Sequence, residues 1–359
     1  MVPASGLIAF PTGATARLAM VDYGHGTTAS RGDVPSSFGM DGGLGIEGRW
    51  SAELFASAGF AVALPDYLSL GVSRLRPQYE VARTEASASL DLLRATQRLA
   101  AATGHRLNGQ VFLTGFSQGA AAALAIARSL QAGTLPALRL MAVGAVSGPY
   151  ELQAAELPAI LDGRVSPAMA SYLLGYVLTA WNPVYHLFAG PAVAFRAPYD
   201  ARVESLFDGA HADQQIAAEL PGDFRQLLTP RYLRELERPS ARLLAALRAN
   251  STCNGWTPRV PVRLIADGPI GEIKTRVGTR TIRATLPSIP IDELAGLPGV
   301  RAADRHGDSV ILTCRDADAA ARALFIRYDD VRDVEISGAR LEDAFLQLTS
   351  DPEPAEVSR

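Results

Sequence analysis

The chain contains an apolar strand, a Gly-x-Ser-x-Gly turn and an alanine-rich helix in immediate succession, from residue 110 to residue 124. The two glycines of this turn, Gly115 and Gly119, let the backbone bend so sharply that the Oγ of Ser117 stands clear of the sheet. The N–H of the next residue, Gln118, is left facing an oxyanion that forms at a substrate carbonyl. This nucleophile elbow predicts serine hydrolysis, provided that the fold also supplies a base.

Strands alternate with helices in the first 150 residues. On either side of the elbow strand, apolar runs predict strands at 5–10, 16–23, 60–64 and 138–146, and helical spacing predicts helices at 49–57, 84–103 and 120–132. Such alternation implies a mostly parallel sheet, whose right-handed crossovers place helices on both faces. The catalytic edge of this sheet is expected at the carboxyl ends of its strands.

The pattern changes twice after the elbow. From residue 150 to residue 254 the strand signal stops and helical patterns broken by proline take over, which we interpret as a helical cap over the active site. A strand at 260–265 then returns the chain to the sheet. The remaining predicted elements follow the order β-α-β-β-α-β, which is typical of a small ferredoxin-like α+β domain. The sequence therefore predicts two domains, at 1–262 and 263–359.

Motifs for cofactors or metals are missing from the sequence. The stretch at 43–48 fits Gly-x-Gly-x-x-Gly, yet no strand leads directly into it, so we interpret it as a flexible loop. No Walker loop, zinc-spaced cysteine pair or His-Glu-x-x-His helix occurs. We therefore predict no cofactor and no metal.

Composition narrows the class of protein further. A hydrophobic fraction of 48% and a charged fraction of 20% favour a folded chain, and a net charge of −3 without a basic stripe gives no indication of a nucleic-acid partner. The two cysteines, Cys253 and Cys314, are too few for a disulfide framework and are interpreted as small hydrophobic residues. The first residues lack the charge and the apolar stretch of a signal peptide, so the sequence as printed predicts a cytoplasmic location.

A loop that follows the second predicted strand is the candidate for a second oxyanion donor. It reads Gly24-His-Gly-Thr-Thr, and a loop at this place contributes an oxyanion N–H in enzymes that have such an elbow. We assign the donor to the amide of Thr27. The alternative is an ordinary glycine turn in which His25 braces the loop, and His25 comes too early in the chain to be the expected base.

Four motifs extend this interpretation over residues 5–264. They are Tyr23-Gly-His-Gly-Thr-Thr, Ala63-Leu-Pro-Asp-Tyr-Leu-Ser-Leu-Gly, Gly115-Phe-Ser-Gln-Gly and Asn254-Gly-Trp-Thr-Pro-Arg-Val-Pro-Val-Arg-Leu. In these motifs the chain resembles the lipase family that includes secreted bacterial and fungal lipases and their esterase relatives. The resemblance implies an α/β-hydrolase fold, Ser117 as the nucleophile, and Thr27 and Gln118 as oxyanion donors. It also implies cleavage of carboxylic esters or acylglycerols without a metal.

The end of the chain resembles a different family. Residues 263–351, from Arg263-Leu-Ile-Ala-Asp-Gly-Pro to Gly338-Ala-Arg-Leu-Glu-Asp-Ala-Phe-Leu-Gln-Leu-Thr, are similar to the C-terminal extension of ABC-transporter ATP-binding subunits of the drug-exporter type. The sequence lacks the nucleotide-binding core of such subunits, so we expect no nucleotide partner. It reads as a fusion of a truncated hydrolase with an accessory domain.

In the lipase pattern, the acid and the base of the triad lie in the part of the chain that the ABC-like segment replaces here. Asp267 follows the last strand and is the best candidate acid, although it suits a turn of the ABC-like segment equally well. The candidate base is His306, whose alternative role is that of an exposed hairpin residue. His186 and His211, in the cap, are further alternatives.

We expect a serine carboxylic-ester hydrolase that forms an acyl-enzyme on Ser117, with an atypical or impaired triad, and that acts on a small-molecule ester or acylglycerol. Enzymes that lose triad members keep about 10³- to 10⁴-fold catalysis over water, so weak turnover would survive. The alternative is a decayed hydrolase that acts in binding or association. A partnership with a membrane permease rests on the tail resemblance alone, and homo-oligomer formation is left open.

Overall fold

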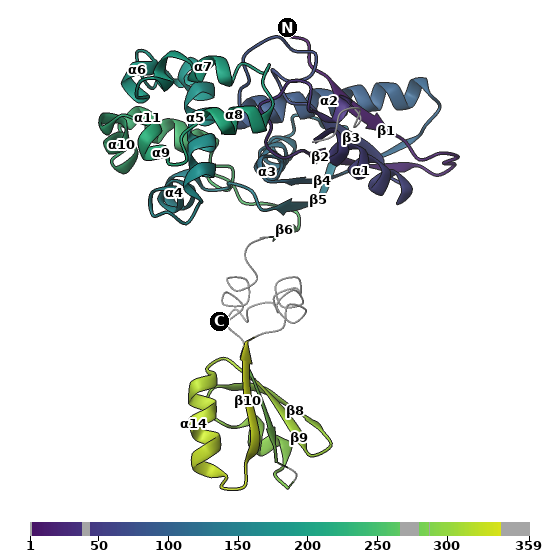
Figure 1. The fold of residues 1–359 in the computed structure, drawn as a ribbon. Helices are drawn as coiled ribbons and strands as arrows, with labels where there is room; N and C mark the ends of the chain where they lie inside the picture. Colours follow the sequence, from purple (N-terminus) through teal and green to yellow (C-terminus); the bar gives the residue numbers. More distant parts are fainter. Residues whose placement is uncertain (1, 38–43, 266–279, 287, 339–359) are drawn as a thin grey trace. The chain divides into compact units, whose positions relative to one another are not determined.

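The computed structural model describes residues 2–37, 44–265, 280–286 and 288–338 (Figure 1). The chain divides into two compact units, residues 1–264 and residues 265–359. Each unit is described on its own. The domain boundary predicted between residues 262 and 263 stays a prediction.

A six-stranded sheet forms the centre of the first unit, counted over the described residues. Its strands are β1 (Gly6–Ala9), β2 (Leu18–Gly24), β3 (Ala61–Pro65), β4 (Leu107–Phe116), β5 (Arg139–Val146) and β6 (Val262–Ile265). They lie in the order β1-β3-β2-β4-β5-β6, in which β1 is antiparallel to β3 and the pairs β3–β2, β2–β4 and β4–β5 are parallel. The mostly parallel sheet expected from the alternating pattern is confirmed.

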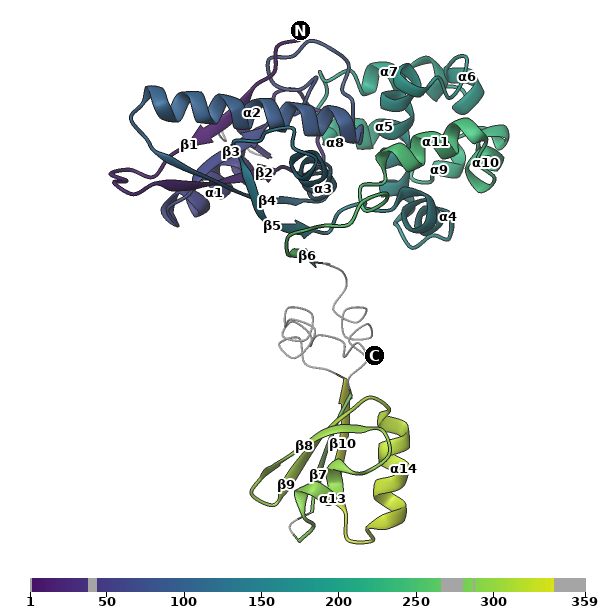
Figure 2. The same cartoon turned by 180° about the vertical axis from the view of Figure 1, so that it is seen from behind.

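Helices cover both faces of this sheet (Figures 1 and 2). They are α1 (Leu44–Ser57), α2 (Ala82–Ala102) and α3 (Gln118–Gln131), and a 3₁₀ turn, η1 (Pro35–Ser37), precedes α1. Because successive side chains of a strand point to opposite faces, β3 supplies two cores. Its Ala61 and Ala63 join the core with α2 and α3, whereas Val62 and Leu64 pack with α1.

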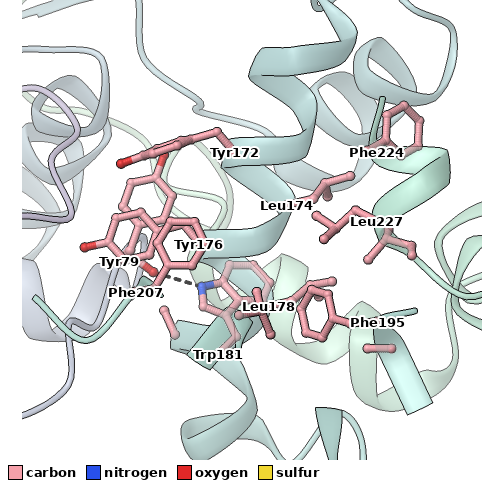
Figure 3. Close-up of a cluster of buried hydrophobic side chains, with 14 of the residues drawn as sticks. Tyr79, Tyr172, Leu174, Tyr176, Leu178, Trp181, Phe195, Phe207, Phe224 and Leu227 are labelled. Carbon is pink, nitrogen blue, oxygen red and sulfur yellow. Dashed lines mark hydrogen bonds between the residues drawn. The ribbon is translucent and has the colours of Figure 1, made fainter. Parts of the chain in front are cut away.

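Between β5 and β6 the chain builds a helical cap with a core of its own. Its elements are η2, a π-helix (Leu152–Glu156), α4 (Leu157–Leu161), α5 (Pro167–Tyr185), α6 (Pro191–Ala194), η3, a 3₁₀ helix (Tyr199–Ala201), α7 (Val203–Leu206), α8 (Asp213–Glu219), α9 (Phe224–Leu227), α10 (Pro230–Glu237) and α11 (Ala241–Asn250). The largest fully buried side chains of this core are Trp181, Tyr176, Phe195 and Phe224 (Figure 3). The segment interpreted as a cap is thus helical.

The second unit has an antiparallel sheet of four strands in its described residues. Along the chain its elements are β7 (Arg280–Thr285), α13 (Ile291–Ala295), β8 (Val300–His306), β9 (Ser309–Cys314), α14 (Ala317–Arg327) and β10 (Arg332–Gly338). The strands lie in the order β10-β7-β9-β8, each antiparallel to its neighbour. Ile282, Leu312 and Leu324 are fully buried between the sheet and the helices. This unit therefore has a core separate from those of the first unit.

Two expectations need correction. The stretch at 43–48 was expected to be a loop, yet from Leu44 onward it belongs to helix α1. The helix packs closely on η1, since a Cβ on Gly48 would lie 2.8 Å from the Cα of Pro35, and this packing outweighs the low helix propensity of glycine. Cys314 is buried, but Cys253 is exposed and does not act as a core residue. Nowhere in the described ranges is there a helix of the length and apolarity that crossing a membrane requires.

Candidate active site

Ser117 lies at the junction of β4 and α3, at the carboxyl end of a central strand. Its backbone has φ 53° and ψ −119°, a combination that is rare for a residue with a side chain. The strained conformation is held by hydrogen bonds on both sides, because the N–H of Ser117 donates to the carbonyl of Val146 at 2.9 Å and its carbonyl accepts from Ala120 at 3.0 Å. Strain that neighbouring structure maintains in this way is typical of functional positions.

The elbow needs glycine at positions 115 and 119 because a side chain would not fit there, and not because of the φ angles of these two residues. Gly115 and Gly119 are absent from the residues with positive φ, which include Ser117 itself. A Cβ on Gly115 would lie 2.5 Å from the carbonyl carbon of Gly119, and a Cβ on Gly119 would collide with the carbonyl of Gly24 at the end of β2. Any larger residue would therefore push the elbow away from the loop that follows β2.

This close approach brings the two predicted oxyanion donors to the same end of the sheet. Gln118 is the first residue of α3, where backbone N–H groups have no partner within the helix. Thr27 lies in the loop after β2, and a Cβ on Gly26 of that loop would lie 3.3 Å from the ring of Phe116, next to the serine. The roles of Thr27 and Gln118 remain predictions, but their segments adjoin each other.

His25 braces this loop. It is fully buried, its Nδ1 lies 2.7 Å from the carbonyl oxygen of Gly26, and its ring packs against Tyr67 with a centroid separation of 4.4 Å. The hydroxyl of Tyr67 in turn donates to the carbonyl of His25 at 3.3 Å. Through these contacts His25 holds the loop in place, which is compatible with an oxyanion role for Thr27 and with an ordinary glycine turn.

The predicted acid and base, Asp267 and His306, both belong to the second unit, residues 265–359. Asp267 lies outside the described residues, and His306 ends β8 in the second unit, where it pairs with Ser309 of the hairpin. In the cap, the Nδ1 of His211 lies 3.4 Å from the Oδ1 of Asp208, and His186 is the C-cap residue of α5. Among the described residues, no side chain hydrogen-bonds to the Oγ of Ser117, and the triad stays a prediction.

Buried carboxyl groups near the elbow were not anticipated from the sequence. Asp22, Glu80 and Glu85 are each at most 4% exposed, and the side chain of Gln118 donates to Glu85 at 2.6 Å. Burial raises the pKa of Asp22 to about 8 and that of Glu85 to about 7. Burial, with the charge of Glu85, also raises the pKa of Glu80 well above its usual range. No local pattern marks these residues, because Glu85 reads as an ordinary acidic residue in a first helical turn.

An apolar cavity of about 80 Å³ lies in the cap. Its walls include Leu157, Leu174, Leu178 and Trp181, and Glu80 is one of its few polar residues. The described residues contain no group of three His, Cys, Asp or Glu side chains that could hold a metal ion. The cavity is suited to an apolar ligand.

Comparisons with known proteins agree with this architecture. The model of the Secretory lipase family matches residues 51–188. A search of curated protein sequences finds no match. Among solved structures, the rice cell wall degrading esterase LipA of Xanthomonas oryzae is 26% identical, with a TM-score of 0.65, over 74% of this chain and 70% of that chain. A hydrolase candidate from Legionella pneumophila has 26% identity and a TM-score of 0.66, over 74% of this chain and 69% of its own.

A more distant match shares the fold alone. Lipase A of Candida antarctica in its closed state is 15% identical, with a TM-score of 0.54, and the match covers 73% of this chain and 60% of that protein. The family match and the structural similarities identify the first unit as an α/β-hydrolase. Ser117 lies at a strand-to-helix turn of this fold, and its role as the nucleophile stays a prediction.

Proposed function

We propose that this protein hydrolyses carboxylic esters through an acyl-enzyme on Ser117. The observation that carries the proposal is the backbone of Ser117, which has a positive φ at a strand-to-helix junction. A positive φ at this junction turns the Oγ out of the sheet, as a nucleophile elbow requires. The family match and the esterase of Xanthomonas oryzae support the same reaction class.

In the proposed reaction the Oγ of Ser117 attacks the ester carbonyl and loses its proton to a base. The carbonyl oxygen becomes an oxyanion, which the N–H groups of Gln118 and Thr27 stabilise. Collapse of this intermediate expels the alcohol, which takes up the proton, and leaves the acyl group on Oγ. Water then cleaves the acyl-enzyme by the same steps. We assign the base to His306 and its orienting acid to Asp267, as an atypical triad.

The substrate is proposed to be a small-molecule ester or an acylglycerol with an apolar acyl chain. The match to the Secretory lipase family and the likeness to an esterase support this choice. The cytoplasmic location predicted from the sequence also remains a proposal.

Hydrolysis of short-chain and long-chain p-nitrophenyl esters tests the proposal. The wild type should show turnover that Ser117→Ala abolishes, whereas Ser129→Ala, which changes a half-buried serine near the other end of the same helix α3, should leave turnover unchanged. Ser129 donates only to the carbonyl of Ala125 within the helix, which makes it a suitable control. Equal rates for the wild type and Ser117→Ala would refute the proposal.

The alternative is a decayed hydrolase that binds ligands without turning them over. It is favoured by one observation, namely that no described histidine hydrogen-bonds to Ser117. A cooperative melt combined with no reaction of Ser117 with a fluorophosphonate probe would support this alternative. Labelling of Ser117 would exclude it.

For the second unit we propose a ferredoxin-like fold and an accessory role. The order of its elements and of its antiparallel strands supports the fold. The resemblance to the tail of ABC-transporter ATP-binding subunits supports an accessory role. Expression of residues 265–359 alone, followed by a thermal melt, would test whether this unit folds independently.

A further inference from the structure

We propose that the segment from Tyr79 to Glu85 positions both oxyanion donors, with Glu85 acting through Gln118 and Tyr79 acting through Thr27. The inference rests on the proposed ester hydrolysis and adds positioning residues to it. Gln118 Nε2 donates to Glu85 Oε1 at 2.6 Å, and the hydroxyls of Tyr79 and Thr27 lie 3.2 Å apart. Two donors from distant parts of the chain are thus held by one short segment.

Glu85 is directed at the elbow rather than at solvent. It is 2% exposed, and its Oε1 accepts both from Gln118 and from the N–H of Glu80 at 3.1 Å. The same oxygen therefore joins the elbow to the segment. Gln118 is itself 3% exposed, so its amide has no access to bulk water as a substitute acceptor. Loss of the Glu85 carboxyl would leave a buried amide N–H without a partner, which favours movement of the residue that carries the oxyanion donor.

The Thr27 loop depends even more on such contacts, because it belongs to no helix or strand. Besides the contact with Tyr79, the carbonyl of Thr28 accepts from Tyr176 at 2.9 Å and the N–H of Ala29 donates to Asp213 at 2.8 Å. All of these partners lie in the cap or pack against it. The position of the loop therefore follows the position of the cap core.

The segment is fixed to that core by stacked rings and by a tryptophan (Figure 3). Tyr79 stacks on Tyr176 at 4.3 Å with an interplanar angle of 4°, and Tyr176 stacks on Phe207 at 4.8 Å. The indole N–H of Trp181 lies within hydrogen-bonding distance of the carbonyls of Tyr79 and Glu80, at 3.2 and 3.1 Å. These contacts make the segment a rigid support, which is what a positioned oxyanion hole requires.

A double-mutant cycle on Glu85 and Gln118 tests the inference, with p-nitrophenyl ester turnover as the readout. Glu85→Leu removes the acceptor and Gln118→Met removes the side-chain donor while keeping the backbone N–H. Each change should lower kcat by about 10- to 100-fold and leave KM within about threefold. If Glu85 acts through Gln118, the double variant should be no slower than the slower single variant.

Two conservative variants separate positioning from a loss of folding. Glu85→Gln keeps an oxygen acceptor for the amide of Gln118 and should retain most of kcat. Tyr79→Phe keeps the stacked ring and loses only the hydroxyl that contacts Thr27, so it should lower kcat with an unchanged melting temperature. The control is Glu219→Gln, a surface carboxylate on α8 that is paired with Arg202, which should not change turnover.

The outcomes distinguish the inference from the function on which it rests. If the wild type shows neither Ser117-dependent turnover nor fluorophosphonate labelling of Ser117, the proposed function fails and the inference fails with it. If the wild type reacts and both Glu85→Leu and Tyr79→Phe react at the wild-type rate, only the inference is overturned. If the losses of activation free energy in the two single variants added up in the double variant, the proposed action of Glu85 through Gln118 would likewise be refuted.

Discussion

Replacement of Gly115 by alanine would place a methyl carbon 2.5 Å from the carbonyl carbon and oxygen of Gly119. Ordinary contact begins near 3.4 Å, so the first turn of α3 would have to move by about 0.9 Å. Gly119 has no room to retreat, because it already adjoins the backbone of Gly24. The displacement would therefore pass to Ser117 and Gln118, which precede it.

Two effects of Gly115→Ala can be estimated. Overpacking of this kind costs about 1–3 kcal/mol in the free energy of unfolding. A misplacement of about 1 Å in a catalytic group lowers turnover by about 100-fold. Urea unfolding and p-nitrophenyl ester hydrolysis would measure the two effects separately.

Gly144→Ala provides the matched control for this variant. Gly144 lies in the neighbouring strand β5, paired with Thr114, and a Cβ there would meet only the Oγ1 of Thr114 at 3.7 Å. The control should therefore keep wild-type stability and turnover. If Gly115→Ala matched Gly144→Ala in both assays, the steric account of the elbow would be refuted.

Three further changes have defined outcomes. Burial raises the pKa of Asp22 to about 8, so the folded state holds a proton that the unfolded state releases between about pH 4 and pH 8. The free energy of unfolding therefore falls by about 1.4 kcal/mol per pH unit as the pH rises through this range. Asp22→Asn should therefore flatten the fall in stability between urea melts at pH 5 and pH 7, and an equally steep fall would contradict this. His306→Ala should lower kcat by at least about 100-fold, and unchanged turnover would remove His306 from the triad. A maleimide should label exposed Cys253 but not buried Cys314 in the native protein, as mass spectrometry would show.

The sheet and the elbow could be predicted because their signals are local. The run that ends at Ser117 combines an apolar strand, two glycines and an alanine-rich helix, and each local preference favours the observed structure. Helix α1 was missed at its start because the glycines at 45 and 48 disfavour a helix locally. Its packing on Pro35 joins residues of different elements, which no local window contains.

The candidate site was predictable only in part, for a related reason. Ser117 and Gln118 belong to one motif, so the sequence places them together. The bond between Gln118 and Glu85 joins residues that are 33 positions apart, and the contact between Thr27 and Tyr79 spans 52 positions. Neither Glu85 nor Tyr79 lies in a recognisable motif. The contacts on which their proposed role rests form only once the cap and the sheet are folded together.

The insertion of the cap between β5 and β6 also orders events during folding. The two strands are neighbours, and the N–H of Val143 donates to the carbonyl of Pro261 at 3.0 Å, yet the chain builds the whole cap before it returns. Closing so long a loop costs entropy before the pairing contributes, so β6 should join the sheet late. During synthesis on the ribosome, β5 would remain an open edge while the cap is made, and unpaired edges are where nascent chains associate.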